Sequence, residues 1–371
     1  MIKKNQYNPD YVSPPGETIE EILNMLNMSQ ADLARRLGFS SKTVNEIVKG
    51  KAPITSTSAL KLELVTGIPA RFWNNRENNY REYLARLAEK ENLVSASEWL
   101  RNFPINEMIK RKWIPKADTS ADQIRSLLQY FGIASIEQWE KIWSSQVDAS
   151  YRQSKAYKAN PYALASWIRQ GEIQALGIKC APYSACAFKE VLYKLRDLTN
   201  ERPEAFCNII QNECSDAGVA VAFVPELPRI LTFGVTKWLT PDKALIELSL
   251  RYKTNDHLWF TFFHEAAHIL FHGKRTVFID ENDTTNDEKE READEFASNI
   301  LIPYKEWEEF KEHKTYMLET EIKEFALKKG IHPGIIVGRL QHEGLIPYNK
   351  LNHLKMRLHW VSSCDDEQDH P

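Results

Sequence analysis

Two histidines and a glutamate stand close together in the run HEAAH, at residues 264–268. Histidines four positions apart lie one above the other on a helix face, so His264 and His268 could bind one metal ion. Glu265 would then lie beside the ion and could act as a general base. The spacing therefore predicts a metal site that activates water for hydrolysis.

The residues around this motif indicate that its helix is buried. Apolar side chains surround the motif nearly all round the helix, in the runs LWFTFF before it and ILF after it. A buried carboxylate and two buried imidazoles need partners, and a metal ion with its bound water supplies them. The alternative is a pair of core histidines that are hydrogen-bonded to backbone carbonyls.

A third metal ligand must come from elsewhere, because catalytic zinc commonly has three protein ligands and an open position for water. The next expected helix, at residues 288–303, has the sequence EKEREADEFASNILIP. On a wheel of about 100° per residue, Glu290 points inward, within about 50° of the centre of the apolar stripe. Asp294, one turn later, could hold a ligand imidazole by a hydrogen bond. We expect Glu290 to be the third ligand, Glu292 to be its alternative and Glu295 to be in solvent.

The two runs HEAAHILFH and EREADEFASNILIP resemble the ImmA/IrrE metallopeptidases, a gluzincin-like group. The resemblance covers roughly residues 186–310, and the later run GIHPGIIVGRLQHEGLIPYN is similar to family members that are fused to DNA-binding domains. It implies that His264, His268 and Glu290 bind Zn²⁺ and that Glu265 activates the water. The implied activity is endopeptidase cleavage of a regulatory protein.

Several segments could complete such a site. Short apolar runs at residues 218–224 and 230–238 predict strands, and residues 244–252 alternate in hydropathy like a half-exposed strand. An edge strand at 244–252 could pair with an extended peptide substrate. The acidic loop at residues 280–287 could move as a lid.

Four further polar residues lie in or near this region. A donor to the tetrahedral oxyanion is expected, and its candidates are His332, Arg339 and His342, although each is more readily explained as a structural or surface residue. His272, four residues after His268, could support that ligand or interact with the end of the helix dipole. We do not expect His272 to be a ligand.

The N-terminal part of the chain, up to about residue 90, predicts short helices and no strand. Ser29 with Asp32 forms a capping box before QADLARRLG, and Gly38 ends that helix. Ser40 can cap the next helix, SKTVNEIV. Three features of this segment predict a helix-turn-helix. They are a small residue in the first helix, a glycine in the turn, and apolar residues at fixed positions of the second helix.

The exposed side chains of this motif fit duplex DNA. Positions at the start of the second helix would face the major groove, and the flanking polar and basic positions suit phosphates. The first set is Ser41, Lys42, Asn45 and Glu46, and the second is Gln30, Arg35, Lys49 and Lys51. The alternative is a helical hairpin with a solvated polar face.

The run PGETIEEILNMLNMSQADLARRLGFSSKTVNEIVKGKAPIT, followed by ALKLELVTGIPARFWNN, resembles the HigA-type antitoxins of the XRE helix-turn-helix family. The resemblance covers about a fifth of the chain. It implies a homodimeric repressor that binds a palindromic double-stranded operator and neutralises a cognate toxin.

These features predict a multi-domain chain with three regions. They are an all-α helix-turn-helix domain at residues 1–78, a helical connector at 79–185 and an α+β, zincin-like domain at 186–371. The connector carries tryptophans that could form a ligand box but at helical spacing are expected in the core: Trp99, Trp113, Trp139, Trp143 and Trp167.

Composition is that of a globular protein. The 371 residues are 43% hydrophobic, and 48 basic against 51 acidic side chains give a net charge of −3, so DNA contact requires a local basic patch. No apolar run reaches the length of about 18 residues that a membrane span needs, and the first residues do not form a secretory signal. The five cysteines form no CxxC pair and are expected to be reduced thiols. We expect a cytoplasmic protein without a membrane partner.

We therefore predict a DNA-binding regulator that carries a zinc endopeptidase acting on a regulatory protein. The alternative is an antitoxin or repressor whose zincin-like domain binds only metal or a partner protein. Glu265 favours the first, because a purely structural zinc site has no use for a base beside two histidine ligands. Hydrolysis of a small amide is a weaker third reading, because the sequence shows no pocket motif for it.

Overall fold

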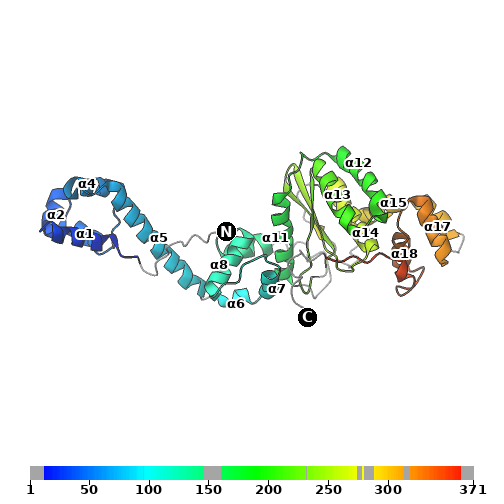
Figure 1. Cartoon of the computed structure of the whole chain (residues 1–371), viewed down its shortest axis with the longest axis horizontal. Coiled ribbons are helices and arrows are strands. Elements are labelled where there is room, and N and C mark those ends of the chain that lie inside the picture. The colour runs from blue at the N-terminus through cyan, green and yellow to red at the C-terminus, as the bar shows by residue number, and fades with distance from the viewer. Residues whose placement is uncertain are drawn as a thin grey trace, which may run out of the picture. The chain divides into compact units, whose positions relative to one another are not determined.

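The structure is a computed structural model that describes residues 12–94, 96–144, 160–230, 232–273, 278–279, 288–312 and 317–360. The chain forms two compact units (Figure 1). We call residues 1–98 with 118–124 the N-terminal unit, and residues 99–117 with 125–371 the C-terminal unit. The acidic loop at 280–287 and Cys364 lie outside the described residues. Within those residues, no helix has both the length and the apolar character needed to cross a bilayer.

The first five helices belong to the N-terminal unit and are coloured blue in Figure 1. They are α1 (Pro15–Met25), α2 (Gln30–Leu37), α3 (Ser41–Val48), α4 (Ser56–Thr66) and α5 (Ala70–Val94). Their apolar faces enclose a core that includes Leu33, Val44 and Trp73. Because α5 continues unbroken through residue 78, the domain limit expected there stays a prediction.

Local signals set the ends of α2 and α3. The Ser29 hydroxyl accepts a hydrogen bond from the amide of Asp32, and the Ser40 hydroxyl accepts one from the amide of Thr43, both at 3.1 Å. Gly38 ends α2 in the left-handed conformation, with φ of 69°, which glycine adopts without strain. The predicted caps and turn of the helix-turn-helix are therefore present.

The next helices are α6 (Ser97–Leu100), α7 (Ile105–Lys110), α8 (Ser120–Phe131), α9 (Ile136–Trp139), the π-helical turn η1 (Glu140–Ser144) and α11 (Pro161–Gly177). Four of the five connector tryptophans are buried, and Trp113 is half-buried. The Trp139 ring stacks on Tyr162 at 4.6 Å and contacts Trp99 edge-on at 6.0 Å. These tryptophans therefore have the expected core role.

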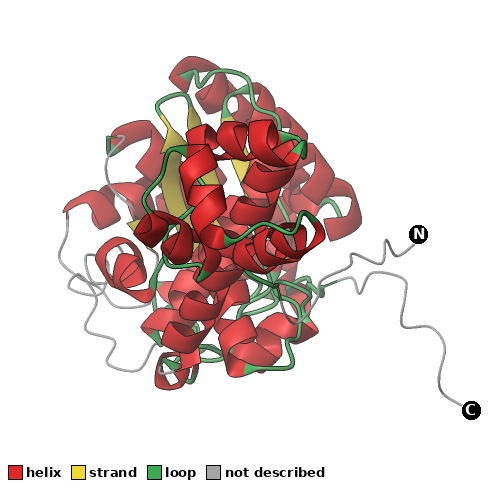
Figure 2. Cartoon of the chain, turned by 90° about the vertical axis from the view of Figure 1, so that its left-hand side faces the viewer, coloured by secondary structure: helices red, strands yellow, loops and turns green. Residues whose placement is uncertain are grey.

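A small sheet follows two helices in the C-terminal unit (Figure 2). The helices are α12 (Ala185–Arg196) and α13 (Pro203–Asp216), with the 3-10 turn η2 (Asp197–Asn200) between them. The strands are β1 (Val219–Phe223), β2 (Gly234–Thr240), β3 (Lys243–Leu248) and β4 (Phe278–Ile279). Their order is β1-β3-β2-β4, in which β1 runs parallel to β3, and β2 runs antiparallel to β3 and β4.

The prediction of a half-exposed edge strand at residues 244–252 was wrong. Strand β3 ends at Leu248 and lies between β1 and β2. Glu247, a polar position in that alternation, is fully buried, because helix α11 packs on this face of the sheet: a Cβ on Gly171 would lie 2.0 Å from Oε2 of Glu247. Helices cover both faces of the sheet, with α11 on one side and α13 and α14 on the other (Figure 1).

The remaining helices are α14 (Asn255–Phe271), α15 (Glu288–Leu301), α16 (Tyr304–Glu312), α17 (Glu319–Lys329), α18 (Pro333–His342) and the 3-10 turn η3 (Asn352–Leu354). Helix α14 lies in the centre of the main core, where Phe262 and Phe263 are completely buried. Helices α15 and α18 pack against it. The predicted multi-domain fold, with an all-helical N-terminal module and an α+β C-terminal region, is confirmed.

Candidate metal centre

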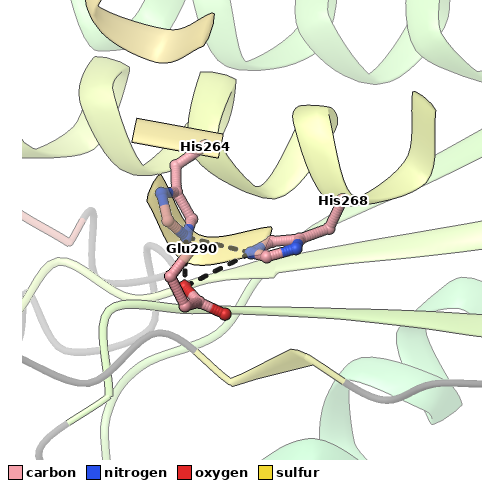
Figure 3. A group of neighbouring side chains, drawn as sticks. All are labelled: His264, His268 and Glu290. Carbon is pink, nitrogen blue, oxygen red and sulfur yellow. Dashed lines mark hydrogen bonds and ion pairs between the residues drawn. The ribbon is translucent and has the colours of Figure 1, made fainter. Parts of the chain in front are cut away.

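Three side chains from two helices converge on one point in the C-terminal unit (Figure 3). His264 and His268 lie one turn apart on α14, and Glu290 lies in the first turn of α15. Nε2 of His264 is 3.0 Å from Nε2 of His268 and 3.1 Å from Oε2 of Glu290. Nε2 of His268 is 3.6 Å from the same carboxylate oxygen.

These separations fit a bound zinc ion. Zinc bonds to histidine nitrogen and carboxylate oxygen are about 2.0–2.2 Å long, so tetrahedral geometry places ligand atoms about 3.3 Å apart. The three observed separations, 3.0, 3.1 and 3.6 Å, bracket that value. Two imidazoles and one carboxylate are also a donor set of catalytic zinc sites, in which water takes the fourth position.

Each ligand imidazole has a partner on its other nitrogen. Nδ1 of His264 lies 2.8 Å from Oδ1 of Asp294. Nδ1 of His268 lies 2.8 Å from Nδ1 of His272, whose Nε2 lies 3.1 Å from Oε2 of Glu292. Such outer contacts fix the tautomer and the ring orientation of metal-binding histidines.

The surroundings of His268 and Glu290 favour the protonation state in which each could bind a metal ion. Burial lowers the pKa of His268, which keeps its imidazole neutral, as a metal ligand must be. Burial opposes ionisation of Glu290, yet hydrogen bonds from His264 and His268 outweigh it and hold the Glu290 pKa well below its ordinary value. The cluster therefore combines a neutral His268 imidazole with an ionised Glu290 carboxylate.

Glu265 is completely buried beside the ligands, where strand β2 meets α14. The Thr236 hydroxyl lies 2.5 Å from Oε2 of Glu265 and 3.0 Å from its backbone oxygen. At the start of the same strand, a Cβ on Gly234 would lie 2.7 Å from Cγ of Glu265 and 2.7 Å from Cγ2 of Thr261. A residue with a side chain would therefore displace Glu265.

The structure brings most of the sequence-derived site residues together. His264, His268 and Glu290 converge, with Glu265 and Asp294 next to them. Glu292, the alternative ligand, contacts His272 instead. Glu295 is exposed, as expected, and pairs with Arg291 at 3.4 Å.

The three oxyanion candidates have other contacts. His332 accepts a hydrogen bond from the amide of Gly334 at the start of α18. Arg339 donates to the carbonyls of Ser298 and Ile302 and pairs with Glu343 at 3.0 Å. The His342 ring lies 6.3 Å from the Phe260 ring.

Sequence reasoning missed Gly234 and Thr236. Both lie in the expected strand at residues 230–238, but nothing in the local pattern indicates that this strand borders the HEAAH helix. Thr236 and Glu265 are 29 positions apart in the chain, so their contact depends on tertiary packing alone.

The candidate DNA-contacting residues lie on and beside α3. Ser41, Lys42, Lys49 and Lys51 are exposed, whereas Asn45 and Glu46 are half-buried. Lys42 lies 3.9 Å from Glu46 and is 84% exposed. Gln30 donates to Glu20 at 3.3 Å, and Arg35 pairs with Asp32.

Two sequence families match the chain. Residues 240–329 match the Peptidase M78 family, described as an IrrE N-terminal-like domain, and residues 19–73 match a helix-turn-helix family. The HTH-type transcriptional regulator YddM of Escherichia coli K12, whose own description is uncharacterised, is 34% identical over 87 residues. That match covers 24% of this chain and 87% of the relative.

Solved structures similar to the N-terminal part include two antitoxin-like proteins. The antitoxin HigA of Pseudomonas aeruginosa, solved with the higBA promoter, is 32% identical, with a TM-score of 0.21; the match covers 22% of this chain and 90% of that one. An addiction module antidote protein of the HigA family from Coxiella burnetii is 28% identical, with a TM-score of 0.21; the match covers 23% of this chain and 92% of that one. The curated relative and the two family matches identify the chain as a member of the HTH-type transcriptional regulators that carries an IrrE N-terminal-like domain in its C-terminal unit.

Proposed function

We propose that the chain is a HigA-like, DNA-binding repressor whose C-terminal unit is a zinc-dependent endopeptidase. The observation that carries the peptidase assignment is the convergence of His264, His268 and Glu290 beside the buried carboxylate of Glu265. The proposed partners are a double-stranded operator, bound by a homodimer, and a regulatory protein or cognate toxin as the substrate.

Residues of this chain have separate roles in the proposed hydrolysis of a peptide bond. Zinc held by His264, His268 and Glu290 would supply Lewis acidity and would lower the pKa of a water ligand to about 7. Glu265 accepts a proton from the attacking water and later donates it to the nitrogen of the breaking peptide bond. Thr236 holds the Glu265 carboxylate in one orientation throughout.

The outer contacts support a catalytic role. Asp294 and the pair His272 and Glu292 orient the two ligand rings without taking the fourth ligand position. A structural zinc site would have four protein ligands and no base. Among the described residues, the metal-ligand cluster contains three ligand residues, which leaves room for water.

The DNA-binding assignment rests on the exposed face of α3. Ser41 and Lys42 begin this helix and are exposed, in the positions from which a recognition helix reads base edges. Asn45 and Glu46 continue that face, and Gln30 and Lys49 flank it as the proposed phosphate contacts. The net charge of −3 does not oppose this assignment, because phosphate contacts depend on local positive charge.

A peptide library tests the peptidase assignment, because such a library requires no identified substrate. The zinc-loaded full chain and its Glu265→Gln variant are incubated with peptides derived from a whole proteome, and new termini are identified by mass spectrometry. We expect a shared sequence context at cleavage sites made by the wild type alone, with about one zinc per chain in both proteins and none in His264→Ala. Identical termini with both proteins would favour the alternative, a regulator whose zincin-like domain does not cleave.

The DNA assignment has a separate test. Random duplex DNA is selected on the full chain, and the enriched sequence is then titrated with wild type, the double variant Ser41→Ala, Lys42→Ala, and Lys90→Ala, which removes an exposed charge from α5. We expect the double variant to lose at least about 10-fold in affinity for the enriched sequence, while Lys90→Ala binds like the wild type. Enrichment of no sequence at all would refute operator binding by this chain.

A further inference from the structure

A cavity of about 670 Å³ lies in the C-terminal unit, apart from the metal centre. Its walls come from the N-terminal half of α14, the C-terminal end of α15, helix α18 and the segment that follows η3. None of the proposed ligands His264, His268 and Glu290 lines it, and neither does Glu265. Its volume is in the range of pockets that hold small organic ligands.

The cavity has a surplus of positive charge. Arg339 and Lys355 are already paired, with Glu343 at 3.0 Å and with Asp256 at 2.6 Å. Lys253 and Arg357 also line the cavity and are exposed, and neither side chain has a hydrogen-bond or ion-pair partner within the described parts of the chain. Two cationic groups are therefore left for an anionic ligand.

Aromatic rings also line this cavity. Tyr252 and Tyr348 line the cavity and are 42% and 69% exposed. The His257 ring lies 4.3 Å from the Tyr252 ring, and Phe260 forms another part of the wall. The Tyr252 ring is also stacked on Phe233 at 4.9 Å and lies 5.5 Å from the Arg251 guanidinium, so the open ring face is that of Tyr348. An exposed tyrosine face in a cavity with unpaired cations suits a ligand in which a planar ring carries a negative charge.

Two further details indicate a prepared site. Asp256 lines the cavity, and its Oδ1 is buried and accepts no hydrogen bond from any described residue, which is a departure from the usual pairing of buried polar groups. Lys253 has a left-handed backbone, with φ of 53°, and its carbonyl accepts a hydrogen bond from the amide of Leu358 at 2.8 Å. A lysine in this region is strained, and such strain gathers at ligand-binding sites.

We propose that this cavity binds a small ligand in which a planar ring carries an anionic group, with the anion held by Lys253 and Arg357 and the ring against Tyr348. Mononucleotides and aromatic carboxylates share this chemistry. This binding goes beyond the proposed peptidase and does not depend on it.

Calorimetric titration of the full chain tests the proposal with 5′-AMP and 4-hydroxybenzoate as probes. Adenosine and inorganic phosphate provide the ring and the anion separately. At least one ring-bearing anion should bind once per chain and at least about 10-fold more tightly than adenosine or phosphate. Binding of 5′-AMP but not of 4-hydroxybenzoate would show that the anionic group of the ligand is a phosphate. Binding of 4-hydroxybenzoate but not of 5′-AMP would show that it is a carboxylate.

Matched variants locate the site. Arg357→Gln and Lys253→Gln should each weaken binding about 10-fold, because each removes one charged partner of the anion. Lys328→Gln, which removes an exposed charge from α17 of the same unit, should leave the affinity unchanged. Because both probes could bind zinc directly, the titration is repeated on chelator-treated protein, where we expect the same affinity.

Three results would overturn the proposal. They are the absence of binding by both ring-bearing probes at millimolar concentration, equal affinity for inorganic phosphate and 5′-AMP, and loss of binding on removal of the metal. None of them bears on proteolysis, so failure here and failure of the peptidase assignment are distinguishable.

Discussion

The Thr236 hydroxyl lies 2.5 Å from the carboxylate of Glu265, and this contact joins strand β2 to the helix that carries the HEAAH run. Both side chains are buried, at 1% and 0% exposure. A carboxylate that acts as a base must keep one orientation towards the attacking water, and a buried hydroxyl supplies that constraint. The sheet therefore contributes directly to the proposed chemistry of α14.

Replacement of Thr236 by Val should reduce proteolysis while zinc binding persists. The substitution keeps the size of the side chain and removes one hydrogen bond to a charged group, worth about 1.5–3 kcal/mol, or about 10- to 100-fold in kcat. The measurement is kcat on a peptide that the wild type cleaves, with zinc content determined in parallel. Thr240→Val, at the exposed end of the same strand, is the control and should cleave normally. Equal rates for both variants would show that Thr236 has no part in positioning Glu265.

Gly234 should not tolerate a side chain. A Cβ there would lie 2.7 Å from atoms of both Glu265 and Thr261, closer than real side chains approach, so β2 or α14 must shift. We expect Gly234→Ala to lower the free energy of unfolding by about 1–3 kcal/mol and to reduce proteolysis further than this loss explains. In denaturant titration, Gly177→Ala should change stability little, because a Cβ at Gly177 meets no atom within 4 Å. A Gly234→Ala protein as stable and active as the wild type would show that the close approach is not required.

Asp294 should set zinc affinity through His264. The Asp294→Asn variant keeps the shape of the side chain but weakens the charge-assisted contact to Nδ1, which lies 2.8 Å away. Loss of such outer contacts typically costs about 10- to 100-fold in metal affinity. Competition with a fluorescent zinc chelator measures the change, and Glu295→Gln, on the exposed side of the same helix, should match the wild type. Equal zinc affinity in Asp294→Asn and the wild type would contradict this role.

The convergence of His264, His268 and Glu290 could be predicted from the sequence because its signals are local. Helical spacing places His264 and His268 on one face, and the apolar stripe of the next helix orients Glu290 towards them. The caps of α2 and α3 are equally local, since each hydroxyl bonds an amide three residues later. Residue type and spacing are sufficient for such features.

Features that depend on the order of strands were missed for a physical reason. Residues 244–252 alternate in hydropathy like an edge strand, yet β3 lies inside the sheet because β1 and β2 pair on either side of it. Alternating hydropathy indicates that a strand is exposed to solvent only when one face of the sheet is open. Here α11 covers the face that carries Glu247. The contact between Thr236 and Glu265 depends on the same long-range packing.

Glu247 should make the C-terminal unit less stable as pH rises. Burial raises the pKa of this carboxyl well above its ordinary value of 4.5, the charge of Glu172 raises it further, and Lys237 opposes both. The folded state therefore holds a proton that the unfolded chain releases above about pH 4.5. The stabilising contribution is complete below that pH and is lost as pH rises towards the folded-state pKa.

The variant Glu247→Gln removes this titration and keeps the shape of the neutral carboxyl. We expect it to be more stable than the wild type at pH 7, by about 1–3 kcal/mol, and to have equal stability near pH 4. Urea unfolding from pH 4 to pH 8 measures the difference, with exposed Glu201→Gln as the control for loss of a carboxylate. If Glu247→Gln and the wild type kept a constant difference across this range, the carboxyl would not titrate with folding. A difference that grows with pH in Glu247→Gln but not in Glu201→Gln assigns the effect to the buried group between α11 and β3.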